Sequence, residues 1–257
     1  MNCPKCLVAL ACLIASVACL VTVRGQADAL EGQQMSSDKQ GVVFFDDFSE
    51  GMDNWWAEGG VRIWVQDQRL HVDAEPGGAR TERRPGLCAT VWCKQQFVGD
   101  VKIECDAQVL RSDCDVNNIN FFIHFSAPSG TPLYDTREDR PEAAYGKYHV
   151  LNGNIITFLS DTREAAMRLL PEQRQARVRI RHCPGFELLK ETYTSNCRQH
   201  KTYHIEILKQ GGKLSFSVDG ELLLTAADPE PPAAGLFGLR TFRTYLWWDN
   251  IKISALE

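Results

Sequence analysis

The sequence has no run of basic residues. Its 28 lysine and arginine residues are spread among 33 aspartate and glutamate residues, and the formal net charge is −5. Proteins that bind nucleic acid concentrate positive charge against the phosphate backbone. The missing basic run therefore argues against a nucleic-acid partner.

Common catalytic signatures are missing as well. The chain contains no GxSxG, no HExxH and no phosphate-binding loop. The ExDxxE strand of jelly-roll glucanases is reduced in "IECDAQV" to Glu104 and Asp106. A retaining mechanism with two carboxylates of that type consequently has no support.

Helical periodicity and internal linkers are scarce between residues 41 and 257, where alternation of apolar and polar residues dominates. One short helix is expected at 162–170, with Pro171 ending it. This pattern predicts a single all-β domain, a sandwich or barrel. The expected strands are 42–48, 61–65, 69–72, 89–97, 101–109, 117–126, 149–159, 176–182, 202–208, 214–218, 221–226, 235–240 and 247–254.

The N-terminus is predicted to be a secretory signal over residues 1–27. Lys5 precedes the apolar run "LVALACLIASVACLVTV", and small residues follow in "RGQA". A lipoprotein box ending at Cys19 and an uncleaved N-terminal anchor are the alternatives. Residues 28–40 are polar and are predicted to be a linker. We expect a secreted or periplasmic protein that leaves the membrane once the leader is removed.

Six of the ten cysteines lie beyond the leader, and they contain no CxxC pair, which weakens a metal-site interpretation. An even number in an exported chain suggests disulfides. If "FVGD" turns a hairpin, Cys93 faces Cys105. Small buried thiols are the alternative. The predicted pairs are Cys93 with Cys105, Cys183 with Cys197 across a polar loop, and Cys88 with Cys114 by elimination.

The end of the chain supplies the first family resemblance. Strands joined by "QGG" and "VDG" are followed by "GLFGLR" and a terminal "DNIKIS" strand, and "FFDDFSEGMDNW" opens the domain. This order resembles the concanavalin-A-like lectin/glucanase superfamily. The resemblance implies a jelly-roll β-sandwich of two antiparallel sheets, whose concave face usually holds carbohydrate.

A second resemblance runs through the middle of the chain. The segments "ATVWCK", "NNINFFIHFSA", "YGKYHVLNGN", "RIRHCPGFELLKE" and "GLFGLR…WWDNIKI" occur in that order and together resemble the YesU-like family, domain of unknown function family 1961. Members of that family occur among genes for the breakdown of pectin-type polysaccharides. The resemblance implies no firmly assigned reaction.

The stretch "NNINFFIHFSA" has two different faces. Ile119, Phe121, Ile123 and Phe125 share one parity and suit a core. The other parity holds the candidate sugar ligands Asn118, Asn120 and Phe122, together with the candidate base His124. Amides offer a donor and an acceptor together, which matches sugar hydroxyls. A solvated strand face is the alternative.

Neighbouring segments add further candidates. Trp92 is a candidate sugar platform, with core packing as the alternative. In "YGKYHVLNGN", Tyr145 or Tyr148 is a candidate acid, His149 a candidate base, and Asn152 and Asn154 candidate ligands. Jelly-roll polysaccharide lyases, by analogy of fold, use a Tyr and a His while an amide or Arg neutralises the uronate carboxylate.

The strand "ARVRIRHCPGF" places Arg177, Arg179 and Arg181 on one face. Guanidinium groups can clamp an acidic sugar. Pairing with acidic neighbours is favoured for Arg177 and Arg179, so Arg181 is the predicted anion ligand. Arg240 is a second cationic candidate, and Glu187 a candidate acid.

No cofactor is expected. A structural calcium ion held by Asp46, Asp47 and Asp249 is the alternative, because this fold often brings the two ends of the chain together.

The sequence thus predicts a carbohydrate-active protein, with an oligosaccharide or polysaccharide as its partner. The first hypothesis is a glycoside hydrolase or polysaccharide lyase that acts on acidic or pectin-type fragments. A non-catalytic carbohydrate-binding module and a structural adhesion domain are the competing hypotheses. A module would keep Trp92, Phe122 and the asparagines but would need no titrating pair.

Overall fold

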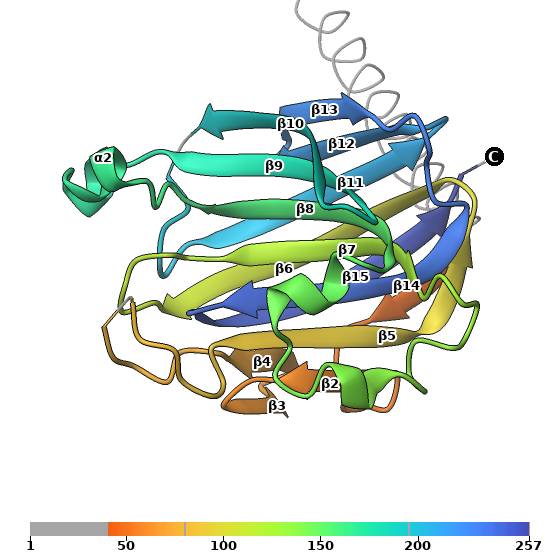
Figure 1. Cartoon of the computed structure of the whole chain (residues 1–257), viewed down its shortest axis with the longest axis horizontal. Coiled ribbons are helices and arrows are strands. Elements are labelled where there is room, and N and C mark those ends of the chain that lie inside the picture. The colour runs from red at the N-terminus through yellow and green to blue at the C-terminus, as the bar shows by residue number, and fades with distance from the viewer. Residues whose placement is uncertain (1–40, 80, 195, 257) are drawn as a thin grey trace, which may run out of the picture. The chain divides into compact units, whose positions relative to one another are not determined.

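The computed structural model describes residues 41–79, 81–194 and 196–256 (Figure 1). The predicted leader and linker lie outside these residues. The described chain forms two antiparallel sheets, which confirms the all-β sandwich. No helix among the described residues is long and apolar enough to span a membrane.

Sheet A has eight strands in the order β13-β12-β11-β6-β15-β4-β3, with β1 paired to β15. Their bounds are β1 Val42–Asp46, β3 Arg62–Gln66, β4 Arg69–Asp73, β6 Val101–Arg111, β11 Thr202–Gln210, β12 Lys213–Val218, β13 Glu221–Ala227 and β15 Tyr245–Ala255.

Sheet B has seven strands in the order β10-β9-β8-β7-β14-β5-β2. Their bounds are β2 Trp55–Gly59, β5 Cys88–Val98, β7 Ile119–Ser126, β8 Asn152–Ser160, β9 Ala176–Cys183, β10 Glu187–Thr194 and β14 Ala234–Phe242. The helical pieces are short: η1 Arg137–Asp139, η2 Tyr145–Tyr148, α2 Glu164–Met167 and η3 Pro171–Gln173.

Strands β2 and β10 are the two that alternation missed. The β2 sequence "WWAEG" has no apolar–polar alternation, and "ELLKETYT" of β10 forms an edge strand without a fully buried residue. The predicted helix at 162–170 is only the single turn α2, because Pro171 starts a separate η3 turn.

The main core lies between the sheets. Ile119, Phe121 and Ile123 of β7 join it as the alternation predicted, and they pack with residues such as Phe216 and Trp248 of sheet A. Burial of this apolar face is the dominant favourable contribution to folding.

The predicted parity of β7 fails at His124. His124 has a φ of 53°, and the β7–β8 register shifts between Ile123 and Ser126. Such a bulge re-aims the residues that follow it. Phe125 therefore leaves the predicted core face for a cluster on the outer face of sheet B. On β14, Gly235 permits this, because a Cβ there would lie 2.2 Å from the His124 carbonyl carbon.

The outer face of sheet B carries a second apolar cluster beneath residues 127–151, the covering segment, which crosses in front of the sheet in Figure 1. Trp92 and Phe122 lie in this cluster and are completely buried. The prediction that they contact sugar is therefore wrong, because the covering segment occupies the space where a sugar would stack.

A buried carboxylate fastens the covering segment to the sheet. Glu58 Oε2 accepts hydrogen bonds from Tyr148 Oη at 2.5 Å and from Trp92 Nε1 at 3.1 Å, and Glu58 Oε1 accepts one from Arg140 Nε at 2.9 Å. Both side chains of the Glu58–Arg140 ion pair are almost completely buried. Burial raises the pKa of Glu58, whereas the Tyr148 hydroxyl and Arg140 oppose that shift.

The six described cysteines are free thiols. The predicted hairpin between Cys93 and Cys105 is wrong, because "FVGD" connects β5 of sheet B to β6 of sheet A. Cys183 pairs with Gly153 on β8, whereas the Cys197 carbonyl accepts a hydrogen bond from Ser160. Seven residues of strand separate these positions, which is about 23 Å at about 3.3 Å per residue.

The third predicted pair, Cys88 with Cys114, is also unformed. Cys88 lies opposite Phe242 in the β5–β14 ladder. The Cys114 sulfur instead accepts a 3.7 Å contact from Arg243 Nη1.

The calcium alternative is not supported either. The first and last described strands, β1 and β15, do pair with each other. However, both oxygens of Asp46 accept protein hydrogen bonds, from the Phe48 amide and from Asn54 and Trp55. The described residues contain no group of three or more His, Cys, Asp or Glu side chains placed to hold a metal ion.

Acid should weaken the fold through His124. Its Nδ1 donates to the Pro232 carbonyl at 3.1 Å, and burial lowers the pKa from 6.5 to about 4. The unfolded chain therefore takes up this proton first, and we expect the free energy of unfolding to fall by up to about 1.4 kcal/mol per pH unit between those values. Urea unfolding at several pH values measures the slope.

His124→Asn should flatten that slope, since Asn tolerates the left-handed backbone. His200→Asn is the matched control, because His200 is exposed and also has a positive φ. An unchanged slope in His124→Asn would contradict the assignment.

Removal of the Tyr148 hydroxyl should loosen the covering segment. We expect Tyr148→Phe to lower the free energy of unfolding by about 1–3 kcal/mol, because the buried Glu58 carboxylate loses a donor. Tyr134→Phe, an exposed tyrosine of the same segment, should change it little. Equal effects in urea titrations would argue against this anchor.

Candidate functional site

A cleft of about 700 Å³ lies on the outer face of sheet B, and we call it the polar cleft. Strands β5, β14, β7, β8 and β9 all contribute to it. Its most informative lining residues are Asn118, Asn120, Tyr145, Thr157, Arg179 and Arg240. Four of these six, namely Asn118, Asn120, Tyr145 and Arg240, were predicted from the sequence.

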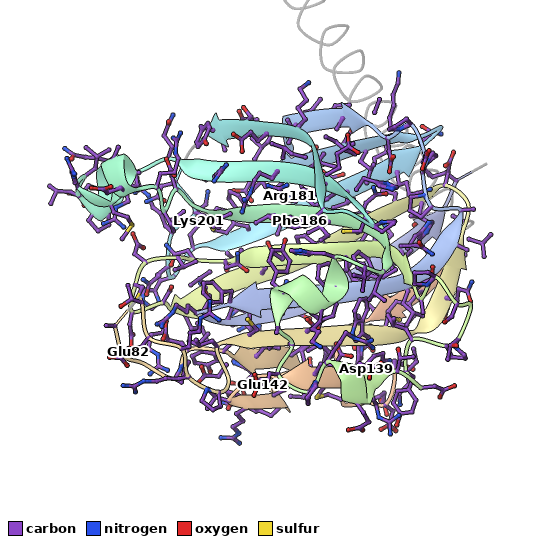
Figure 2. All side chains as sticks on the ribbon, in the orientation of Figure 1. Glu82, Asp139, Glu142, Arg181, Phe186 and Lys201 are labelled. Carbon is purple, nitrogen blue, oxygen red and sulfur yellow. The ribbon has the colours of Figure 1, made fainter. Side chains whose placement is uncertain are left out.

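Two pieces of chain wall the polar cleft. Residues 81–88, the rim loop, contribute Glu82, and residues 142–146 of the covering segment contribute Glu142 (Figure 2). Both walls meet at Gly59 of edge strand β2. A Cβ at Gly59 would lie 2.4 Å from the Cys88 carbonyl oxygen and 2.9 Å from the Ala143 Cβ. Only glycine lets the two walls approach this closely.

Arg240 lies at the bottom of the polar cleft with about 1% of its surface exposed. Its Nη1 donates to the Thr90 hydroxyl at 3.1 Å and to the Ala143 carbonyl at 3.0 Å. Its guanidinium also lies 4.5 Å from the centre of the Tyr145 ring. These contacts hold the cation in place, yet its buried Nε has no hydrogen-bond partner among the described residues.

Arg179 brings a second cation into the polar cleft. Its Nε is likewise buried without a partner in the described part of the chain. Burial lowers the pKa of Arg179, and nearby Arg177 lowers it further. Arg177 itself pairs with Glu191, with Nη2 and Oε2 2.6 Å apart. The sequence favoured pairing for both residues, so the interpretation of Arg179 is corrected.

Asn118 and Asn120 supply acceptors. Both side chains are buried, and the Oδ1 atom of each has no hydrogen-bond partner within the described residues. The backbone of Asn118 is fixed by Thr244 and Thr241. A buried polar atom without a partner is costly, and functional sites are where such atoms are found. The cleft thus presents two acceptors and two cationic donors.

A stack of rings borders this group. The His149 ring lies flat on Phe186, with centroids 3.7 Å apart, and the Arg181 guanidinium lies 4.1 Å from the Phe186 centroid. Tyr145 contacts His149 edge-on at 4.9 Å. Figure 2 shows Arg181 and Phe186 next to each other. His149 and Arg181 do not line the polar cleft itself and reach it only through Tyr145.

Protonation states follow from this crowding. Burial lowers the pKa of His149 below 6.5, and the cations Arg240 and Arg181 lower it further, which keeps the ring neutral at pH 7. Burial raises the pKa of Tyr145, so its phenol stays protonated, and it forms a side-chain hydrogen bond with Thr157. A neutral imidazole and a phenol side by side can exchange protons with a bound ligand.

Several predicted residues lie elsewhere. Tyr148 is completely buried against Glu58, so it cannot act as the predicted acid. His124 faces Pro232. Asn152 bonds Ser126 at a separate cavity, Asn154 binds the buried Asp228, and Glu187 is exposed and does not line the polar cleft.

Sequence reasoning missed three residues of this region. Glu58 follows a Trp pair in a strand that alternation did not detect, so nothing marked it as buried. Thr157 shares the parity of Ile155 on β8, which was a usable signal. Phe186 follows the "CPG" turn and has a φ of 60°, a conformation that its sequence does not indicate.

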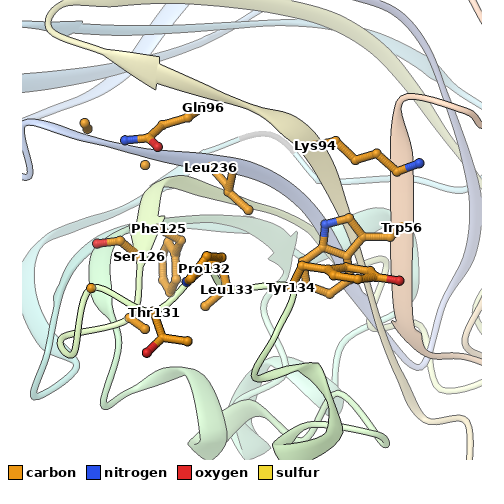
Figure 3. Close-up of a pocket in the computed structure, with 14 residues that line it drawn as sticks. Trp56, Lys94, Gln96, Phe125, Ser126, Thr131, Pro132, Leu133, Tyr134 and Leu236 are labelled. Carbon is orange, nitrogen blue, oxygen red and sulfur yellow. The ribbon is translucent and has the colours of Figure 1, made fainter.

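A second cavity of about 700 Å³, the aromatic pocket, lies on the same face beyond the covering segment (Figure 3). Trp56 and Tyr134 meet edge-to-face at 5.3 Å on one wall. Phe125 and Leu236 lie at its other side, with Gln96 above Leu236 and Lys94 above Trp56 in the view. No lining residue is shared between the two cavities.

Three solved structures show the same architecture. A protein of unknown function with a galectin-like fold from Bacillus subtilis has a TM-score of 0.66 and 16% identity, over 83% of this chain and 96% of its own. The carbohydrate-binding module CBM66 from Bacillus subtilis has a TM-score of 0.53 and 12% identity, over 79% and 97%. A β-glucanase from Bacillus licheniformis has a TM-score of 0.52 and 9% identity, over 85% and 100%.

At such low identities these likenesses show the fold alone, and they confirm the predicted jelly-roll β-sandwich. No curated protein sequence matches the chain. The resemblance to the YesU-like family is not confirmed. The family model described as "Domain of unknown function (DUF6250)" matches residues 85–251, which is well over half of the chain. The protein therefore belongs to the DUF6250 family.

Proposed function

We propose that the polar cleft binds an acidic, uronate-containing carbohydrate, and that Tyr145 and His149 act on it by β-elimination. The observation that carries the proposal is the convergence of four buried polar atoms without partners, on Asn118, Asn120, Arg179 and Arg240. Such atoms demand a ligand that both donates and accepts hydrogen bonds.

A uronate residue meets this demand. Its carboxylate can accept charge-assisted hydrogen bonds from Arg179 and Arg240, and its hydroxyls can donate to Asn118 and Asn120. A neutral sugar would leave the two guanidinium groups desolvated without an anion, which is costly. The carbohydrate-binding module and the β-glucanase of similar fold support carbohydrate as the ligand class.

Elimination uses the groups already next to the cations. His149, which contacts Tyr145 edge-on just outside the cleft lining, takes the proton from C5 of a uronate that extends past Tyr145. The electron pair forms the C4–C5 double bond, and the C4–O bond breaks. Tyr145 gives its phenolic proton to the leaving oxygen. Arg179 and Arg240 stabilise the negative charge that develops on the carboxylate. Water later restores the proton of Tyr145 and removes that of His149.

Hydrolysis is the second candidate. Of the residues lining the polar cleft, Glu82 and Glu142 are the carboxylates, and both are exposed on its walls. Glu82 is already paired with Arg84. Elimination is favoured because Tyr145 lines the cleft and contacts both the Arg240 guanidinium and the His149 ring. A non-catalytic binding module would use the same floor without Tyr145 and His149.

Export and a pectin-type substrate complete the proposal. The signal sequence expected at residues 1–27 supports export of the protein from the cell. Plant polysaccharide fragments are found outside the cell. The resemblance to the YesU-like family supports pectin-type chains in particular.

Arg179→Gln should weaken binding of oligogalacturonate. Loss of one charge-assisted hydrogen-bond donor predicts a dissociation constant about ten- to hundredfold higher. Arg177→Gln is the matched control on the same strand, because Arg177 is committed to Glu191. Isothermal titration calorimetry measures both. An equal loss in the two variants would count against the cleft as the binding site.

Tyr145→Phe and His149→Gln should abolish formation of unsaturated uronate ends while leaving binding of oligogalacturonate within about threefold, since neither change removes a cation or an amide. As the pH is lowered, the wild-type rate should begin to fall only below pH 6.5, because burial and two cations lower the pKa of the base His149. Absorbance of the unsaturated product reports turnover. Binding by the wild type with no such product would favour the non-catalytic module.

A further inference from the structure

We infer that the polar cleft is closed at one end and receives a terminus of the carbohydrate chain, not its interior. This inference rests on the proposed function for the ligand class. It adds which part of the polymer is recognised. The observations that carry it are the two walls and the place where they meet.

The first closure lies across the strands. A chain entering over β9 passes Arg179 and Thr157, then Asn120 and Arg240, towards edge strand β2. There Cys88 of the rim loop and Ala143 of the covering segment pack so closely around Gly59 that a Cβ on Gly59 would clash with both. A straight chain on this path stops at that junction.

The second closure lies along the strands. On β14, Arg240 lines the polar cleft and Leu236 lines the aromatic pocket, about 13 Å apart at about 3.3 Å per residue. The space between them is filled by Trp92, Phe122 and Tyr148, all fully buried. A straight chain along the strands meets this cluster and the covering segment above it.

Both walls are fixed by buried polar contacts, so neither resembles a loop that lifts to admit a chain. The covering segment is held at Glu58 by Tyr148 and Arg140. The rim loop is held by Arg243, which has no exposed surface. Its Nη2 donates to the Ala79 and Glu82 carbonyls, and its backbone amide donates to the Leu87 carbonyl.

A closed cleft has a chemical consequence. A chain interior has sugar residues on both sides of the bound one, and the walls leave space on one side only. The deepest site, next to Arg240 and Tyr145, therefore fits a terminal residue. An elimination there releases one small fragment from the end of each chain per turnover.

Calorimetric titration of wild-type protein with oligogalacturonates of increasing length, and with long polygalacturonate, tests this inference. We expect one protein bound per accepted chain end whatever the chain length, with a dissociation constant per chain that stays within about threefold. A stoichiometry that rises with chain length would overturn it, because interior sites would then be occupied. Failure to bind any of the chains would instead overturn the proposed function, and this inference with it.

End-blocked chains give an independent measurement. Attachment of a bulky bead to one of the two ends should abolish binding, whereas attachment to the other end should leave it unchanged. Binding that survives both attachments would contradict a closed cleft. Tyr134→Ala should bind long chains as the wild type does, and weaker binding by that variant would show that chains cross the covering segment into the aromatic pocket.

Discussion

The Glu58 carboxylate is the interaction on which the functional face of this protein depends. Burial disfavours the charged form of this carboxylate. Its hydrogen-bonding capacity is nevertheless used, because the Tyr148 phenol, the Trp92 indole and the Arg140 guanidinium all donate to it. Leaving one partner of such a buried pair unmatched is far more destabilising than never having the pair. The covering segment is thereby tied to sheet B at Glu58, in addition to the hydrogen bond from Arg240 to the Ala143 carbonyl, and its residues line both cavities.

The polar cleft reverses this logic. At Glu58 both carboxylate oxygens have donors, whereas two strands away, from Arg240 onwards, the floor carries amide oxygens and guanidinium Nε atoms without partners among the described residues. Natural sequences violate local satisfaction mainly where function requires it. The contrast between a fully paired network and an unpaired floor on one face is the clearest physical sign of where a ligand belongs.

The sequence could predict the sandwich because strands with one buried face have apolar residues at every second position, as in Ile119, Phe121 and Ile123. It also placed Asn118 and Asn120 on the outer face, where they line the polar cleft, and it named Arg240 as a cationic candidate. It could not predict that this face would be covered, which buried Trp92 and Phe122 and turned Tyr148 into an anchor. Nor could it place His124, since a bulge inverts the parity of whatever follows it. The Cys93–Cys105 pair failed because the sequence "FVGD" is compatible both with a hairpin within one sheet and with a connection to the other sheet.

The two cavities draw on three common strands, β5, β7 and β14, and share no lining side chain. Substitutions in one can therefore accumulate without altering the other, provided the tie at Glu58 is kept. Among relatives, the charged cavity and the aromatic one are free to diverge at different rates. The two cavities on this one sheet face can in this way change their ligand specificity separately.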